Sequence, residues 1–142
     1  MYKTISPILN REAAIVVPKR KSFKSYPTAQ QHSESFVNTF WEEMTGIELD
    51  ITLGPRTMDR RVCSYFIDYE LYGYRFGDKW ESLFLPLIDM IKDGQKVISV
   101  DVDYRHPASQ RRYEEGNLEM TMKRLEQLNC LVTHLYDYWH RK

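Results

Sequence analysis

The stretch AAIVVPKRK, residues 13–21, begins with a short apolar run. A proline ends this run, and basic residues follow. A continuous run of alanine, isoleucine and valine of this length is typical of a strand buried on both faces. Because proline removes a backbone donor, we expect the strand to end at Pro18. Residues 18–27 then predict a basic loop of irregular structure.

A helix is predicted directly after this loop, in the segment 28–45. Thr28 with Gln31 three residues later matches a capping box, and Gly46 stands where a left-handed helix stop is expected. The apolar residues that recur at helical spacing are Phe36, Val37, Phe40, Trp41 and Met44.

Three later segments alternate between apolar and polar residues, which is typical of strands with one buried face. They are IELDITLG (47–54), RVCSYFIDYELYGYRF (61–76) and KVISVDV (96–102). The segment 78–94 lies between the last two and predicts a helix that begins near Asp78 and ends at Gly94. Pro86 lies inside it, so we expect the helix to be kinked or split there.

The C-terminal segment 109–141 predicts one long helix. Four of its apolar residues repeat every seven positions, with two leucines between them. At 1.5 Å per residue this helix would be about 45 Å long, so we expect it to overhang the domain or to bend at Gly116. The residues of this predicted interface helix are Leu118, Leu125, Leu128, Val132, Leu135 and Trp139.

The apolar stripe of the interface helix needs a surface to pack against. One possibility is the edge of its own domain, and the other is a second copy or a helix of another protein. Large aromatic residues at its end (Tyr136, Tyr138 and Trp139) are typical of binding surfaces, so we expect a homodimer.

The order of predicted elements is β-α-β-β-α-β followed by a long helix. This order predicts an α+β protein with the ferredoxin-like, split βαβ plan, in which two helices cover one face of a four-stranded antiparallel sheet. A length of 142 residues is typical of one domain, so we treat residues 1–142 as a single α+β domain.

Composition narrows the classes of protein further. The 20 basic and 20 acidic residues balance, so the net charge favours neither nucleic acid nor an acidic membrane. Two distant cysteines do not predict a disulfide framework. No apolar run is long enough for a membrane span, and the N-terminus does not resemble a secretory signal. We therefore expect a cytoplasmic protein.

Acidic residues fall on the polar side of the three alternating segments. We expect them to form an acidic docking face for a basic partner. Three other readings stay open: a plain solvated sheet face, a face that docks the protein's own basic segment, or a metal site formed by one pair of carboxylates with His106. The residues are Glu48, Asp50, Asp68, Glu70, Asp101 and Asp103.

Basic residues form two clusters, at 19–24 and 56–61, the first with aromatic residues between them. Such clusters bind nucleic acid through phosphate contacts and base stacking. They also occur in solvated loops, including one folded back onto the acidic face. The residues of this basic patch are Lys19, Arg20, Lys21, Lys24, Arg56, Arg60 and Arg61.

No catalytic motif is present, and we assign no catalytic residue, metal ligand or cofactor. The four histidines lack the spacing of metal ligands, and neither cysteine belongs to a C-x-x-C pair. The sequence therefore favours a small non-catalytic intracellular binding or regulatory protein that acts through protein–protein contacts. The alternatives are a nucleic-acid-binding accessory protein and, third, a metal-dependent enzyme that acts on phosphates.

Overall fold

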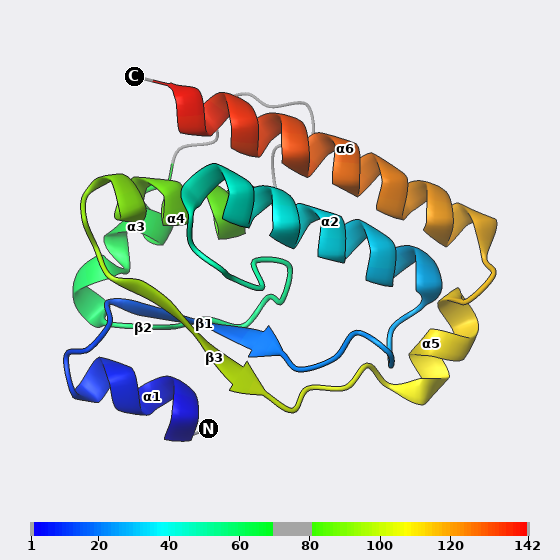
Figure 1. Ribbon diagram of the computed structural model, residues 1–142, viewed down its shortest axis with the longest axis horizontal. Coiled ribbons are helices and arrows are strands. Elements are labelled where there is room, and N and C mark those ends of the chain that lie inside the picture. The colour runs from blue at the N-terminus through cyan, green and yellow to red at the C-terminus, as the bar shows by residue number, and fades with distance from the viewer. Residues whose placement is uncertain (1, 70–80, 142) are drawn as a thin grey trace.

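The computed structural model describes residues 2–69 and 81–141, and the elements of Figure 1 are those of these two ranges. They comprise six α-helices, three strands and one 3₁₀ turn (Arg60–Val62). In chain order the helices and strands are α1 (Tyr2–Leu9), β1 (Ile15–Arg20), α2 (Thr28–Thr45), β2 (Thr57–Met58), α3 (Ser64–Ile67), α4 (Glu81–Lys92), β3 (Val97–Val102), α5 (Ala108–Glu114) and α6 (Leu118–His140).

The strands form one sheet in the order β2-β1-β3. β1 pairs antiparallel with β2 and parallel with β3, with Ile15 opposite Val97 and Arg20 opposite Val102. The α+β class is therefore confirmed. The ferredoxin-like assignment is not confirmed, because the sheet of the described residues has three strands and its longest pairing is parallel instead of antiparallel.

Helices cover both faces of this small sheet (Figure 1). α1, which the sequence did not predict, contacts all three strands from one side. α2 and α4 lie on the other side, and α6 packs against both of them. The core between sheet and helices includes Val17, Trp41, Ile51, Ile88 and Leu135, each almost fully buried.

β1 is the buried central strand, as the sequence predicted, but it does not end at Pro18. It continues through Lys19 to Arg20. The backbone N–H of Lys21 donates to the Val102 carbonyl in β3, whereas that of Arg20 donates away from β3, to Asp50. Since alternate residues face opposite edges of a strand, the nitrogen of Pro18 also faces away from β3. β2 pairs only with Ile15 and Val16, so the missing N–H of Pro18 breaks no ladder bond.

The strand predicted at 47–54 is wrong, and so is the outer position of Asp50, which is buried; three of the apolar residues are nevertheless buried as predicted. Leu49, Ile51 and Leu53 are buried as the alternation implies. Their backbone pairs with no strand, and residues 50–53 close a turn in which the Leu53 N–H donates to the Asp50 carbonyl. The alternation therefore reports an irregular segment packed on the core.

The strand predicted at 61–76 is wrong as far as the structure describes it, up to residue 69. Asp59 accepts a hydrogen bond from the Arg61 N–H, which starts the 3₁₀ turn Arg60–Val62. The short helix α3 follows. The backbone in this segment is therefore helical where the alternation predicted an extended strand. Residues 70–76, with Glu70, lie outside the described residues, as does Asp78.

The helix predicted at 28–45 is confirmed, and Gly46 ends it in the left-handed region with φ 71°. The capping box is wrong: Pro27 holds the cap position, and the Gln31 amide donates to the Tyr26 carbonyl instead. The helix predicted at 78–94 is described from Glu81 to Lys92. It continues across Pro86 without a split.

The C-terminal helix is bent at Gly116, one of the two outcomes expected for it. α5 ends before this glycine, whose φ of 74° is unfavourable for other residues. Asn117 then caps α6, its side-chain oxygen accepting from the N–H groups of Glu119 and Met120. The predicted helix 109–141 is thus two helices.

We predict that Gly116→Ala lowers the free energy of unfolding by about 1 kcal/mol, because alanine is strained at positive φ. A Cβ atom at Gly116 would meet no atom within 4 Å, so the effect reports backbone strain rather than a clash. Gly54→Ala is the matched control, because a Cβ there is also unobstructed and Gly54 is not among the positive-φ residues. Urea denaturation measures both variants, and an equal effect in the two would contradict the assignment.

Candidate functional site

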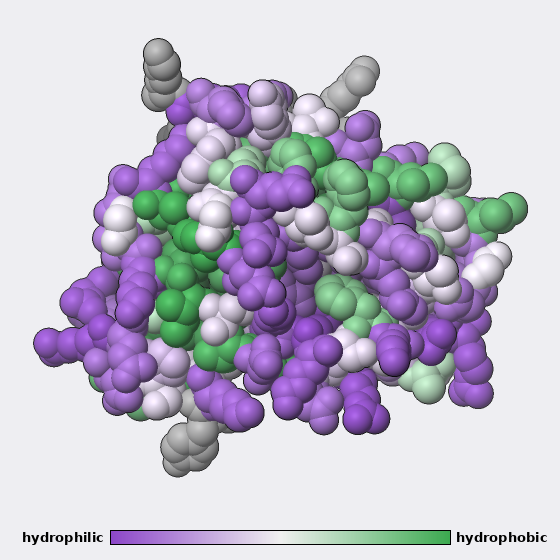
Figure 2. Space-filling model, viewed as in Figure 1, coloured by the Kyte–Doolittle hydropathy of each residue, from purple (hydrophilic) through white to green (hydrophobic). Residues whose placement is uncertain are grey.

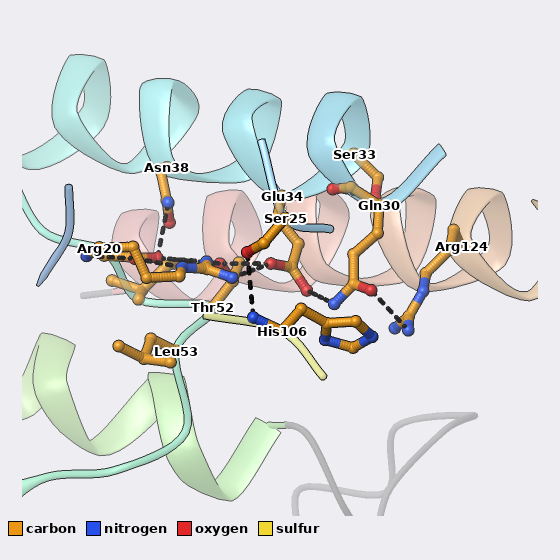
Figure 3. A network of polar contacts seen from close by, with 12 residues as sticks. Arg20, Ser25, Gln30, Ser33, Glu34, Asn38, Thr52, Leu53, His106 and Arg124 are labelled. Atoms are coloured by element: carbon orange, nitrogen blue, oxygen red, sulfur yellow. Dashed lines mark hydrogen bonds and ion pairs between the residues drawn. The ribbon is translucent and has the colours of Figure 1, made fainter. Parts of the chain in front are cut away.

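The most elaborate polar arrangement among the described residues centres on Arg20, the last residue of β1 (Figure 3). Its side chain is 1% exposed, and that of its partner Asp50 is 2% exposed. Arg20 Nε and Nη2 donate to the two oxygens of Asp50, both at 2.6 Å. Nη1 donates to Glu34 and Nη2 also donates to Thr52, again at 2.6 Å. Asn38 of α2 donates to the same Asp50 carboxylate at 2.9 Å.

The arrangement continues from Glu34 along α2 toward α5 and α6. Gln30 donates to Glu34 at 2.6 Å and accepts from Arg124 of α6 at 3.1 Å. Arg124 also donates to Glu114 of α5, a carboxylate with a 5% exposed side chain, at 3.2 Å. A chain of charge-assisted hydrogen bonds therefore joins β1, α2, α5 and α6. We call the residues Arg20, Gln30, Glu34, Asp50, Glu114 and Arg124 the buried network.

Aromatic rings contact the Arg20 guanidinium and fix the loop that follows β1. The guanidinium carbon lies 4.1 Å from the ring centre of Phe23 and 4.7 Å from that of Tyr26. Tyr26 in turn packs on His106, with ring centres 4.7 Å apart. These cation–π and ring contacts connect the loop after β1 to the segment after β3.

The electrostatics of the Arg20–Asp50 pair favour the charged form of both partners. Burial alone lowers the pKa of Arg20, but the Asp50 hydrogen bond and the nearby charges outweigh it, and the pKa lies above its ordinary value. Burial raises the pKa of Asp50, and the hydrogen bonds and charge of Arg20 reverse this, so that its pKa is lowered. The pair is ionised at neutral pH and is structural, because its donors already have acceptors within the protein.

The predicted acidic docking face does not form as one surface of the described residues. Lys19 pairs with Glu48 and Arg20 with Asp50, so the first acidic pair is held by the protein's own basic segment. Asp101 is exposed on β3, in register with Lys19. Asp68 lines a hollow near α3. Asp103 lines a separate hollow at the end of β3, where its carboxylate lies 3.5 Å from the Arg105 guanidinium.

The predicted basic patch is divided in the same way. Arg20 is buried, and Arg56 donates to the carbonyls of Ile51 and Leu53. Burial lowers the pKa of Arg56 to about 10, although the charge of Asp50 opposes the change, so the group stays charged at neutral pH.

The exposed members of the basic patch lie at the two ends of β1. Residues 57–58 pair with the start of this strand, which places Arg60 and Arg61 beyond its amino end. Lys21 and Lys24 follow its carboxyl end, about 20 Å away at 3.3 Å per residue. One surface that contains both clusters is therefore not formed.

The predicted interface helix residues point to opposite sides of α6. Leu135 is buried, and Leu128, Val132 and Trp139 are partly buried against the core of the same chain. Leu118 and Leu125 are 79% and 52% exposed. Leu128 and Leu135 thus pack inside the domain and do not belong to an outer stripe.

Sequence reasoning missed Gln30, Glu34, Glu114 and Arg124 as members of the buried network. One signal for two of them was present. Positions 30, 34, 37 and 41 share one face of α2, and the last two carry the buried Val37 and Trp41. Polar residues one and two turns before such a stripe occupy core positions and need partners there.

Three further observations concern metal binding, membrane spans and similarity to known proteins. Within residues 2–69 and 81–141, no group of three or more histidine, cysteine, aspartate or glutamate side chains is placed to hold a metal ion. Among the described helices, none has both the length and the apolarity that a membrane span requires. Comparisons of the chain with protein-family models, curated proteins and solved structures find no match.

We predict that Asp50→Asn lowers the free energy of unfolding by about 3 kcal/mol or more, because it leaves a buried guanidinium without its main counter-charge. Asp101→Asn, which removes the same charge from an exposed strand position, is expected to cost less than about 0.5 kcal/mol. The double variant Arg20→Met with Asp50→Leu should recover only part of the loss. It removes the unpaired charge, but the Arg20 backbone N–H loses its acceptor, and Glu34 and Asn38 lose their partners in the pair. Urea denaturation distinguishes these cases, and equal costs for the two Asp→Asn variants would contradict the proposed role.

The lowered pKa of Asp50 also predicts how stability depends on pH. A carboxylate whose pKa is lower in the folded state stabilises the protein above its unfolded pKa of about 3.9, and this contribution is lost as pH falls through the folded value. The natural protein should therefore lose more stability than the double variant does as pH falls below about 4.

The pKa of Asp59 is also lowered, to about 2, because its side chain and Arg61 are hydrogen-bonded. Asp59 is present in both proteins and cancels in the comparison. Parallel stability curves for the natural protein and the double variant would contradict the assignment to Asp50.

Proposed function

We propose that this protein is a small non-catalytic intracellular binding or regulatory protein that works through protein–protein contacts as a homodimer. The observation that carries the proposal is a row of exposed apolar side chains on α6. Leu118, Met122, Leu125 and Tyr136 are between 52% and 79% exposed. Figure 2 shows apolar surface along this helix.

The row lies opposite the face that α6 packs against α2. Met122 and Leu131 are nine residues apart, and at about 100° per residue their side chains leave the helix in opposite directions. Leu131 is buried at 7% exposure, whereas Met122 is 55% exposed. The helix therefore carries two apolar faces, of which one is used within its own chain.

The spacing of the outer row is that of a coiled-coil seam. Its positions alternate four and three residues apart along most of α6, which supports pairing with another helix. They are Leu118, Met122, Leu125, Asn129, Val132 and Tyr136, of which Val132 is partly buried against the core of its own chain. The seam positions form two alternating sets. Leu118 and Leu125 belong to one set, and Asn129 belongs to the other. Leucine in one set with an asparagine in the other is typical of two-stranded parallel pairs, in which the asparagines face each other.

A second copy of this chain is the partner that such a seam favours. A two-fold axis along α6 places each residue of the seam against its own counterpart, so the surface is complementary to itself. At 1.5 Å per residue the 23 residues of α6 extend about 35 Å, which gives three heptads for the contact.

The basic partner that we propose would bind at a single hollow beside Asp68, which is smaller than the acidic face expected from the sequence. Asp68 lines a hollow of about 380 Å³ together with Asp89 and Asp93. Tyr65 and Tyr138 donate to two of these carboxylates at 2.6 and 2.7 Å. The three carboxylates complement a lysine or arginine of the partner, and this supports a docking role for Asp68.

We predict that Met122→Glu with Leu125→Glu converts a dimer into a monomer, because four charges would be placed in the apolar seam of the pair. Size-exclusion chromatography with light scattering across a range of concentrations measures the mass. Leu9→Glu is the matched control, since Leu9 is 75% exposed on α1 and lies outside the seam. A natural protein that is monomeric at every concentration, or a control that dissociates equally, would overturn the proposal.

A further inference from the structure

The loop after β1 and the segment after β3 together enclose a polar hollow of about 340 Å³. It falls within the low end of the range of small-ligand sites, about 300–1,000 Å³. Its lining consists of Lys21, Ser22, Lys24, Ser25, Asp103, Tyr104 and Arg105. Three cationic groups thus surround the space, against one carboxylate.

The place of this hollow in the fold follows from the parallel pairing of β1 and β3. Both strands end at the same edge of the sheet, at Arg20 and Val102. Ligands of sheets with parallel strands bind in the crevice beyond the carboxyl ends of the strands, where loops from neighbouring strands meet. The hollow occupies that position.

The loop 21–26 is held in place by contacts that do not use its cationic groups. Arg111 donates to the Lys24 carbonyl at 2.9 Å, and the His106 N–H donates to the Ser25 hydroxyl at 3.0 Å. The Lys24 N–H donates to the Ser22 hydroxyl at 3.2 Å. Both hydroxyls accept in these bonds, so each has its own proton to donate to a ligand.

The cationic groups are accessible and weakly engaged. Lys21, Lys24 and Arg105 are exposed. Arg105 lies 3.5 Å from Asp103, and both side chains of this pair are more than two-thirds exposed, at 80% and 72%. Such a pair contributes little, so an incoming anion competes readily for the guanidinium.

The amino end of α2, which could otherwise attract an anion, is already occupied. The Thr28 N–H donates to both oxygens of Glu115 at 3.3 Å. An anion that approaches this edge of the sheet therefore meets Lys21, Lys24 and Arg105 instead of the helix.

We propose that this hollow binds a phosphate group. Arg105 offers a planar fork of donors that matches phosphate oxygens, the two lysines supply positive charge, and Ser22 and Ser25 supply hydroxyl donors. The group can belong to a small phosphate ester or to the backbone of a polynucleotide, since both present the same oxygens. This site is separate from the α6 seam and does not depend on dimer formation.

Inorganic pyrophosphate, titrated into the ¹⁵N-labelled protein at about 50 mM salt and followed by NMR, tests the proposal. Saturable shifts confined to the amides of residues 21–26 and 103–106 are expected. Lys21→Gln and Arg105→Gln should each weaken binding about 10-fold, because each removes a charged donor. Asp103→Asn should strengthen binding by up to about 5-fold, because it removes the competing carboxylate.

Lys96→Gln is the matched control, because Lys96 is exposed at the opposite end of β3 and the substitution removes the same charge. Absence of saturable shifts, or an equal loss in the control, would overturn the proposal. A single-stranded oligonucleotide in a parallel titration distinguishes the sources. Binding far tighter than that of pyrophosphate, with a steep salt dependence, indicates a polynucleotide, and equal or weaker binding indicates a small phosphate ester.

Discussion

The buried ion pair between Arg20 and Asp50 is the interaction on which the rest of this structure depends. β2 covers only the first two residues of β1, so the far half of the central strand has one open edge. Asp50 closes that edge, because its carboxylate accepts both the Arg20 backbone N–H and the guanidinium. Burying two charges is costly, and the added hydrogen bonds from Asn38 and to Glu34 offset that cost.

The same interaction positions both proposed surfaces. Through Glu34, Gln30 and Arg124 it joins β1 to α2 and α6, and so adds polar contacts to the apolar packing of the inward face of α6. Through the stacking of Phe23 and Tyr26 on Arg20 it also fixes the loop that carries Lys21 and Lys24. A single buried arginine thus connects the α6 seam at one side of the molecule with the polar hollow at the edge of the sheet.

Local signals in the sequence predicted the helix at 28–45 and the strands β1 and β3, but they missed α1, the irregular segment at 47–54 and the strand pairings. The helix at 28–45 and its stop at Gly46 follow from spacing and from one backbone conformation, both of which are local. The alternation at 47–54 correctly reported that Leu49, Ile51 and Leu53 are buried, but alternation carries no information about which backbone pairs with which. Arg20 resembled its basic neighbours in sequence because its partner Asp50 lies 30 residues away. The seven-residue repeat in the sequence contains three of the six proposed seam residues, Leu118, Leu125 and Val132. The sequence did not show that Leu135 is buried whereas Leu125 is exposed, because this difference depends on packing.

Native-state hydrogen exchange at the Arg20 amide tests most directly whether Asp50 completes the central strand. This N–H donates to a side chain of an irregular segment, not to a strand. If the ion pair closes the strand edge, the amide should exchange as slowly as that of Val17 in the middle of β1, through global unfolding only. Exchange at the rate of an exposed loop amide, with Val17 still protected, would contradict this account.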